Sequence, residues 1–125
     1  MGEQDNRETV ERLWQLMDKQ DWQAAGELLH DDFVQEWPQS GERIRGRDNC
    51  MAINQNYPGF PKMSTGRILA AGDLVTSEVT LDYGGQVYKG VSIFEFRDGK
   101  ILRQTDYFAQ PFQAPGWRAQ WVERT

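Results

Sequence analysis

Hydrophobic residues in the first third of the chain recur at the spacing of two amphipathic helices. The apolar positions that follow the 3.6-residue period are Val10, Leu13, Trp14, Leu16 and Met17, and then Trp22, Ala25, Leu28 and Leu29. Asp5 or Asn6 can cap the first helix and Asp21 can cap the second, because their side-chain oxygens accept hydrogen bonds from unpaired backbone N–H groups. The pattern therefore predicts two helices separated by a short break at residues 19–21.

The next stretch predicts one short strand and a third helix. Residues 31–38 form the strand, which a proline and the loop at residues 39–41 bring to an end. The third helix is predicted from Arg47 or Asp48 to about Tyr57, where a Pro-Gly pair ends it.

From residue 63 onward the pattern changes to that of β-strands. Four segments rich in β-branched and aromatic residues are the predicted strands: residues 67–71, 74–83, 86–97 and 100–112. The dipeptides between them are Gly72-Asp73, Gly84-Gly85 and Asp98-Gly99, and Gly-Gly and Asp-Gly supply the positive φ angles that tight hairpins need. The four strands should form a consecutive antiparallel meander, and helices followed by a meander predict an α+β fold.

The length of the chain predicts a single domain. A chain of 125 residues leaves little room for a second hydrophobic core. Residues 1–125 are therefore expected to form one domain without internal repeats. Residues 113–125 are interpreted as a short C-terminal extension that makes a turn of helix and carries Trp117 and Trp121.

Charge and composition limit the classes of partner and cofactor. Fourteen Lys and Arg against nineteen Asp and Glu give a net charge of −5, so the electrostatic attraction that drives binding to nucleic acids and anionic membrane surfaces is missing. The single cysteine, Cys50, excludes an internal disulfide, and the single histidine, His30, excludes the usual zinc patterns. The sequence shows no glycine-rich phosphate loop and no ligand cluster, so we expect no metal, nucleotide or flavin.

The sequence also bears on location. No apolar stretch approaches the roughly 18 residues that a membrane span needs. Residues 1–11 lack the basic and apolar regions of a signal peptide. A cytoplasmic protein is therefore expected.

Five short motifs, taken in order, resemble those of one protein superfamily. They are Leu-Leu-His-Asp-Asp at residues 28–32, Val-Gln-Glu-Trp at 34–37, Ile-Arg-Gly-Arg-Asp at 44–48, Phe-Glu-Phe-Arg-Asp-Gly-Lys-Ile at 94–101 and Gln-Thr-Asp-Tyr at 104–107. With the order of the predicted elements, they resemble the nuclear transport factor 2-like (NTF2-like) superfamily, and most closely its SnoaL-like branch, over about residues 7–110. The resemblance implies a cone, in which three helices wrap a cystatin-like curved antiparallel sheet. It does not imply one function, because this superfamily includes both enzymes and binding proteins.

Asp106 is the candidate catalytic residue. Strand alternation places it on one face with Leu102, Gln104 and Phe108. If that face lines the cone, desolvation favours the protonated carboxyl and suits it to proton transfer. The resemblance to SnoaL-like cyclases implies an acid/base role for this aspartate. The alternative is a buried carboxylate that serves structure alone.

The three catalytic groups of ketosteroid isomerases are absent at the matching positions. Their base, tyrosine and protonated acid correspond by resemblance to Trp37, Leu13 and Ser92. Trp37 can instead wall the cavity and offer its N–H group to an oxygen of a ligand. It can equally be a core tryptophan at the mouth of the cone.

Aromatic residues from several predicted elements converge on the interior of the cone. The candidates for lining a cavity are Trp14, Trp37, Tyr57, Phe60, Phe94 and Phe108. Such a lining suits a small, flat hydrophobic ligand, although aromatics at this spacing are also typical of a core. The resemblance further implies a homodimer through the outer face of the sheet.

Three interpretations follow. In the first, the chain is an enzyme that cyclises or isomerises a small hydrophobic oxygenated substrate without a cofactor, with Asp106 as the acid/base and Trp37 and Gln104 as positioning residues. In the second, the cone binds a small molecule without catalysis, or the chain is a dimerisation module. In the third, side chains fill the cone and function lies at the dimer surface.

Overall fold

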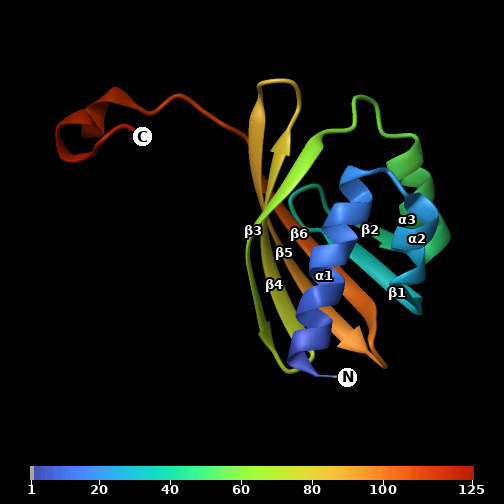
Figure 1. The fold of residues 1–125 in the computed structure, drawn as a ribbon. Coiled ribbons are helices and arrows are strands. Elements are labelled where there is room, and N and C mark those ends of the chain that lie inside the picture. Colours follow the sequence, from blue (N-terminus) through green and yellow to red (C-terminus); the bar gives the residue numbers. More distant parts are fainter. Residues whose placement is uncertain (1) are drawn as a thin grey trace.

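Three helices pack against one curved sheet of six strands in the computed structural model, which describes residues 2–125 (Figure 1). The helices are α1 (Glu3–Asp18), α2 (Trp22–Glu27) and α3 (Arg47–Gln55). The strands are β1 (Leu29–Trp37), β2 (Glu42–Arg45), β3 (Lys62–Ala71), β4 (Leu74–Asp82), β5 (Val87–Arg97) and β6 (Lys100–Ala109), and the chain ends with a short 3₁₀ helix, η1 (Gly116–Trp121). None of the helices described in residues 2–125 is both long and apolar enough to cross a membrane.

The three predicted helices are present, but the start of the first and the ends of the other two differ from the prediction. The second helix ends at Glu27, so Leu29, which was expected in it, instead begins β1, and the third ends at Gln55.

The carboxylate of Asp21 accepts from the backbone N–H of Ala24 at 3.2 Å and caps α2. The first helix begins earlier than predicted, with Gly2 as its cap, so Asp5 and Asn6 lie inside it. Asn6 is buried, where it binds the turn after β3 instead of capping the helix.

Polar side chains of α1 tie the helix to β3 and to the turn that follows it. Asn6 Nδ2 donates to Gly72 O at 3.2 Å, and Arg7 Nε donates to Ile68 O at 3.2 Å. At the other end of the helix, Asp18 Oδ1 accepts from the backbone N–H of Met63 at 2.8 Å. These bonds fix α1 along the concave side of the sheet.

The sheet has the strand order β2-β1-β6-β5-β4-β3, so the predicted meander of the last four strands is confirmed. The first strand of this meander begins at Lys62, earlier than predicted, and the last ends at Ala109 and not at residue 112. The pairs of the sheet are antiparallel except β1 with β6, which run parallel. The sequence did not predict β2, because this strand has four residues and a single buried apolar position, Ile44. It pairs with β1 at the edge of the sheet.

A bulge in β6 changes the face that one residue occupies. Glu95 pairs with Arg103, but Phe96 pairs with Ile101, so Leu102 is an extra residue on β6. Ile101 is consequently fully buried in the core, whereas Leu102 leaves the face on which strict alternation placed it. Gln104, Asp106 and Phe108 keep the predicted orientation toward the interior.

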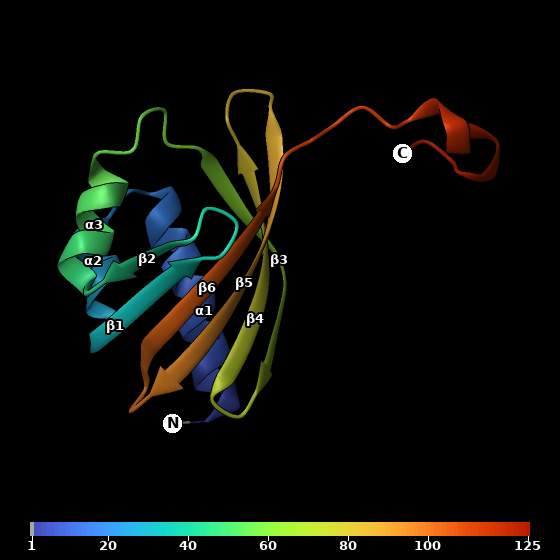
Figure 2. The same ribbon diagram turned by 180° about the vertical axis from the view of Figure 1, so that it is seen from behind.

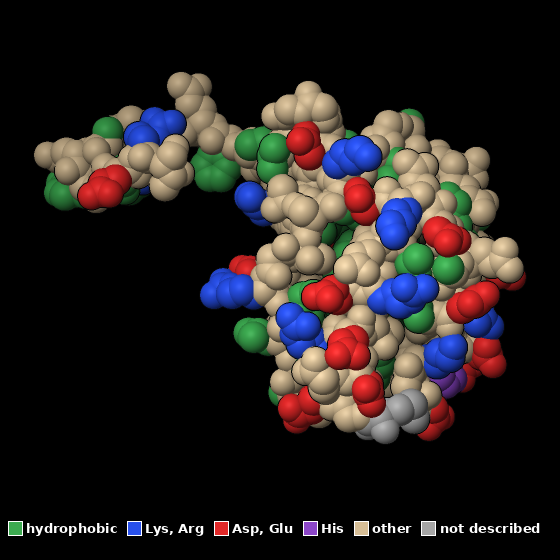
Figure 3. Space-filling model, in the orientation of Figure 1, with side chains coloured by type: hydrophobic (Ala, Val, Ile, Leu, Met, Phe, Trp, Pro, Cys, Tyr) green, Lys and Arg blue, Asp and Glu red, His purple; other side chains and the backbone are tan. Residues whose placement is uncertain are grey.

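The sheet curves around α1, and the core lies between them (Figures 1 and 2). Val10, Leu13 and Trp14 of α1 meet Val75 and Phe94 of the sheet there. Within the described chain, the three helices all lie on the concave side, which leaves the other face of the sheet uncovered by them (Figure 2). In Figure 3 acidic and basic side chains are interspersed over the body of the protein.

Residues 110–125 extend away from the body and are called the C-terminal arm below. The arm leaves the end of β6 and carries η1 at its far end (Figures 1 and 2). Trp117 and Trp121 are 73% and 71% exposed. The predicted turn of helix is present as η1, but it makes no part of the core of residues 2–125.

Candidate functional site

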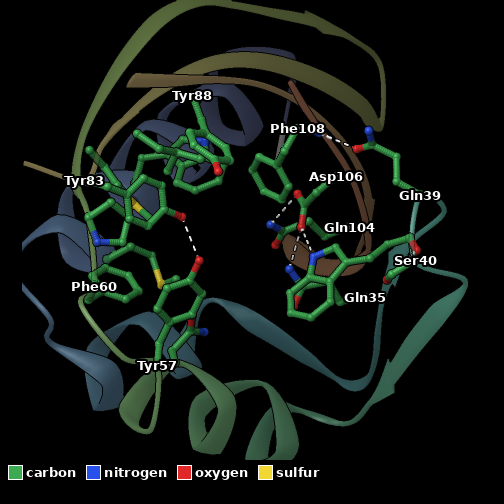
Figure 4. Close-up of a pocket in the computed structure, with 17 residues that line it drawn as sticks. Gln35, Gln39, Ser40, Tyr57, Phe60, Tyr83, Tyr88, Gln104, Asp106 and Phe108 are labelled. Carbon is green, nitrogen blue, oxygen red and sulfur yellow. Dashed lines mark hydrogen bonds between the residues drawn. The ribbon is translucent and has the colours of Figure 1, made fainter. Parts of the chain in front are cut away.

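A cavity of about 310 Å³ lies between the concave face of the sheet and the helices. Its lining comes from α1, from strands β1 and β6, from the end of α3 and the loop that follows it, and from the adjoining ends of β3, β4 and β5. The turn between β1 and β2 completes it. Most of this lining is aromatic or aliphatic. Two groups of polar side chains face one another across it, one around Asp106 and one at Tyr57 and Tyr83 (Figure 4).

Asp106 is almost completely buried, at 1% exposure, and four side chains donate to it. Its Oδ2 accepts from Gln35 Nε2 at 2.6 Å and from Trp37 Nε1 at 2.9 Å. Its Oδ1 accepts from Ser92 Oγ at 2.5 Å and from Gln104 Nε2 at 3.0 Å. A carboxylate offers about four lone-pair sites, so the protein itself occupies all of them.

Strand pairing brings these donors together. Gln35 and Trp37 are two residues apart on β1 and therefore point to the same side of the sheet. The register of the sheet pairs Gln35 with Gln104 and Ser92 with Asp106. Three neighbouring strands, β1, β5 and β6, thus converge on one carboxylate.

A buried thiol fixes the orientation of one of the donors. Cys50 of α3 donates through Sγ to Gln35 Oε1 at 3.2 Å. Burial, and to a smaller extent the nearby Asp106 carboxylate, raise the pKa of Cys50 to about 12. The thiol therefore keeps its proton at neutral pH and acts as a donor, which leaves the Nε2 of Gln35 facing Asp106.

The opposite wall is a cluster of aromatic rings. The hydroxyls of Tyr57 and Tyr83 lie 2.7 Å apart, and Phe60 and Tyr88 pack edge-on against the two tyrosine rings (Figure 4). Burial, followed by the hydrogen bond from Tyr57, raises the pKa of Tyr83 above its ordinary value. The Tyr83 hydroxyl therefore keeps its proton at neutral pH. One of the two hydroxyl protons is used within the pair, and the other remains available to a ligand.

Seven of the site residues expected from the sequence lie on the cavity: Trp14, Trp37, Tyr57, Phe60, Gln104, Asp106 and Phe108. Their roles in binding and catalysis stay predictions. The expectation that Phe94 lines the cavity is wrong, because its fully buried ring packs edge-on against Trp14 in the core.

The structure also changes the role expected for Trp37. Its indole N–H donates to Asp106 and is not left free for a ligand. The sequence analysis missed Gln35, Tyr83 and Tyr88 as parts of the site. Gln35 could have been found from its spacing, because it lies two residues before Trp37 and so shares a strand face with it. Tyr83 and Tyr88 could have been found from the Gly-Gly turn between them, which places both at the same end of the sheet.

A curved six-stranded sheet with helices on its concave face is the architecture of NTF2-like proteins, and known proteins confirm this class. Residues 10–104 match the sequence model of the SnoaL-like domain, and the chain belongs to this family. The comparison with curated protein sequences gave no match.

Three solved structures illustrate the likeness. An NTF2-like protein of unknown function from Burkholderia xenovorans LB400 is 41% identical, with a TM-score of 0.87 over 98% of this chain and 97% of that one. A proposed ketosteroid isomerase from Kribbella flavida DSM 17836 is 31% identical, with a TM-score of 0.90 over 98% and 90%. An epoxide hydrolase of the LEH-like type from M. tuberculosis is 26% identical, with a TM-score of 0.71 over 85% and 84%.

Proposed function

We propose that the cavity binds a small, flat and largely apolar molecule that carries an oxygen function. The observation that carries this proposal is the aromatic cavity with hydrogen-bonding groups on two opposite walls. Pockets for small molecules have volumes of about 300–1,000 Å³, and the cavity volume of about 310 Å³ lies at the lower end of that range. The ligand is therefore small.

Two polar groups are placed to recognise the oxygen of such a ligand. Gln104 lines the cavity and uses its Nε2 on Asp106, so its amide oxygen remains to accept from a ligand hydroxyl. On the other wall, the hydroxyl pair of Tyr57 and Tyr83 has one proton to donate to a ligand hydroxyl or carbonyl. Alcohols, phenols and ketones fit this pattern better than ions, because the rest of the lining is apolar.

The contacts of Asp106 favour binding over proton transfer. A general base must reach a proton of the substrate with a free lone pair. Here the donors from Gln35, Trp37, Ser92 and Gln104 occupy both oxygens of the carboxylate. Asp106 therefore serves best as the fixed centre that orients the surrounding amides and the indole.

The experiment compares 2-naphthol with naphthalene, which differ by one hydroxyl, in titrations followed by tryptophan fluorescence. We expect the naphthol to bind about tenfold more tightly, since one hydrogen bond contributes roughly 1 kcal/mol. Tyr57→Phe and Gln104→Met remove the two candidate partners one at a time, and at least one of them should abolish the preference. Tyr107→Phe is the matched control, because Tyr107 is exposed and does not line the cavity. Equal binding of the two compounds, or no binding of either, would contradict the proposal.

Acid/base catalysis is the second candidate function, and one observation favours it. Two of the donors to Asp106, the hydroxyl of Ser92 and the amide of Gln104, can rotate away and free Oδ1 on the cavity wall when a substrate replaces them. Relatives described as a ketosteroid isomerase and an epoxide hydrolase are compatible with such chemistry.

Turnover separates the two functions. Steroid enones, 1,3-diketones and epoxides would be assayed with the wild type and with Asp106→Asn. Catalysis that disappears in the Asn variant while ligand binding persists would establish the second function. Binding of 2-naphthol with no turnover of any of these substrates would support binding alone.

A further inference from the structure

The C-terminal arm presents large hydrophobic side chains to solvent. Phe112, Trp117, Trp121 and Val122 are all exposed, although they belong to the most apolar residue types of the chain. Several large apolar side chains exposed on one short segment are typical of an interaction site. The body of the same chain does not cover it, because the arm points away from the body (Figures 1 and 2).

A hydrogen bond fixes the first residue of the arm to the body. Gln110 Nε2 donates to Tyr88 Oη at 2.7 Å, so the arm starts beside a residue that lines the cavity. From there it runs to the side of the molecule opposite α2 and α3, in both views (Figures 1 and 2). Eight residues of extended chain reach about 26 Å, which carries Trp117 well beyond the sheet.

The sheet beneath the arm offers a second uncovered apolar surface. Leu69, Leu74, Val91 and Tyr107 are exposed, whereas the residues that alternate with them, such as Ser92 and Asp106, face the interior. Val91 and Tyr107 are directly paired across β5 and β6. A molecule that covers this face also lies within reach of the arm.

Charge favours a second copy of this chain as that molecule. The arm carries Arg118 and Arg124 against a single acidic residue, Glu123, whereas the chain as a whole has a net charge of −5. The side chains of the arm therefore carry a net charge of +1 and those of the body −6, and opposite charges of this kind favour docking of the arm on the body of another copy. Two-fold symmetry would let both copies exchange their arms in the same way.

The matches to two solved relatives extend over the arm. The arm makes up more than a tenth of the 125 residues, so a match over 98% of the chain includes it. The proteins from Burkholderia and Kribbella match over that share, whereas the M. tuberculosis protein matches over 85%, a share close to that of the body alone. Both of the relatives from Burkholderia and Kribbella therefore have a counterpart of the arm.

We propose that, in the dimer through the outer face of the sheet that the family resemblance implies, the two copies exchange their C-terminal arms reciprocally, so that each arm docks on the body of the other copy. Trp117 and Trp121 are the anchors, since aromatic side chains that become fully buried contribute most to such interfaces. This dimer carries the arm of each copy onto the body of the other.

The first test measures the association of the full-length chain by sedimentation velocity. Trp117→Ala with Trp121→Ala should raise the dimer dissociation constant at least about a hundredfold, because burial of each large apolar side chain contributes a factor of about ten or more. The conservative pair Trp117→Phe with Trp121→Phe should restore most of the affinity. A wild type that stays monomeric, or a dimer unaffected by the alanine pair, would overturn the proposal.

The second test locates the arm. A photoreactive benzoylphenylalanine replaces Trp117 in the full-length chain, and chains with natural and with ¹⁵N isotopes are mixed before irradiation. Cross-linked peptides that combine both isotopes are expected, with the arm of one chain joined to the body of the other. Cross-links confined to a single chain would show that the arm folds back on its own body and would refute the exchange.

Discussion

Replacing Asp106 distinguishes a satisfied polar cluster from an ordinary core position. In Asp106→Asn the new amide has one oxygen and one NH₂ group. Trp37 and Gln35 can keep donating to the oxygen, because the indole N–H has no alternative role. On the other side, the Ser92 hydroxyl can rotate and the Gln104 amide can flip, so that both accept from the new NH₂ group. The arrangement therefore survives.

The expected losses differ strongly between two substitutions. Asp106→Asn exchanges charge-assisted hydrogen bonds for neutral ones, but it also removes a buried charge, so we expect a loss of about 1–3 kcal/mol of unfolding free energy. Asp106→Leu leaves four donors without a partner, and each buried unsatisfied group costs about 1–3 kcal/mol, so we expect at least about 4 kcal/mol. A natural single domain is stable by only about 5–15 kcal/mol, so the leucine variant should be close to unfolding.

The assay is urea unfolding followed by both tryptophan fluorescence and circular dichroism. Asp98→Asn is the matched control, because Asp98 lies exposed in the turn before β6 at φ 53°, a conformation that asparagine tolerates. It should change the unfolding free energy by less than about 0.5 kcal/mol. The reasoning fails if Asp106→Leu is as stable as the wild type, or if Asp106→Asn is the less stable of the two.

Three further predictions concern the surroundings of the site and one helix cap. Gly90→Ala should destabilise the protein by about 1–3 kcal/mol in urea unfolding, because a Cβ there would lie 2.9 Å from both the ring of Phe108 and Val79 Cγ1; an unchanged midpoint would show that Phe108 moves freely. For Cys50 the folded state raises the pKa from 9.0 to about 12, so the thiol's contribution to stability is fully present below pH 9.0 and is lost as the pH rises toward 12. The difference in unfolding free energy between wild type and Cys50→Ser should therefore shrink over that range, and a constant difference would contradict it. Asp21→Ala should cost about 1 kcal/mol in thermal unfolding, since it removes the cap of α2, and an unchanged melting temperature would disprove the capping role.

Local patterns predicted most of the fold. The 3.6-residue period gave α1, and the three turn dipeptides separated the strands of the meander, because both signals depend on residues that are close in sequence. The short edge strand β2 was not predicted, because one apolar residue in four does not give the alternating pattern of a strand. The bulge at Leu102 was not predicted either, because a change of register is set by the partner strand.

The site was predicted only in part, because local sequence patterns show some of its residues and not the contacts between distant ones. Strand alternation correctly predicted that Asp106 and Gln104 face the interior. The donor from Gln35 lies 71 residues away from Asp106 in sequence, and no local spacing encodes that contact. The parallel pairing of β1 with β6 creates it. Phe94 was misplaced because periodicity shows that a side chain points inward but not whether it meets a cavity or another ring.

The bonds from α1 to β3 have a consequence for solubility. β3 is the last strand of the sheet, and an open strand edge is a template on which other chains add strands and form aggregates. Arg7 and Asp18 occupy the backbone groups of Ile68 and Met63 that such a strand would use. Substitutions of these two polar residues should therefore promote aggregation even where the folded state retains its stability. Helix α1 thus protects the open edge of the sheet in addition to packing against its core.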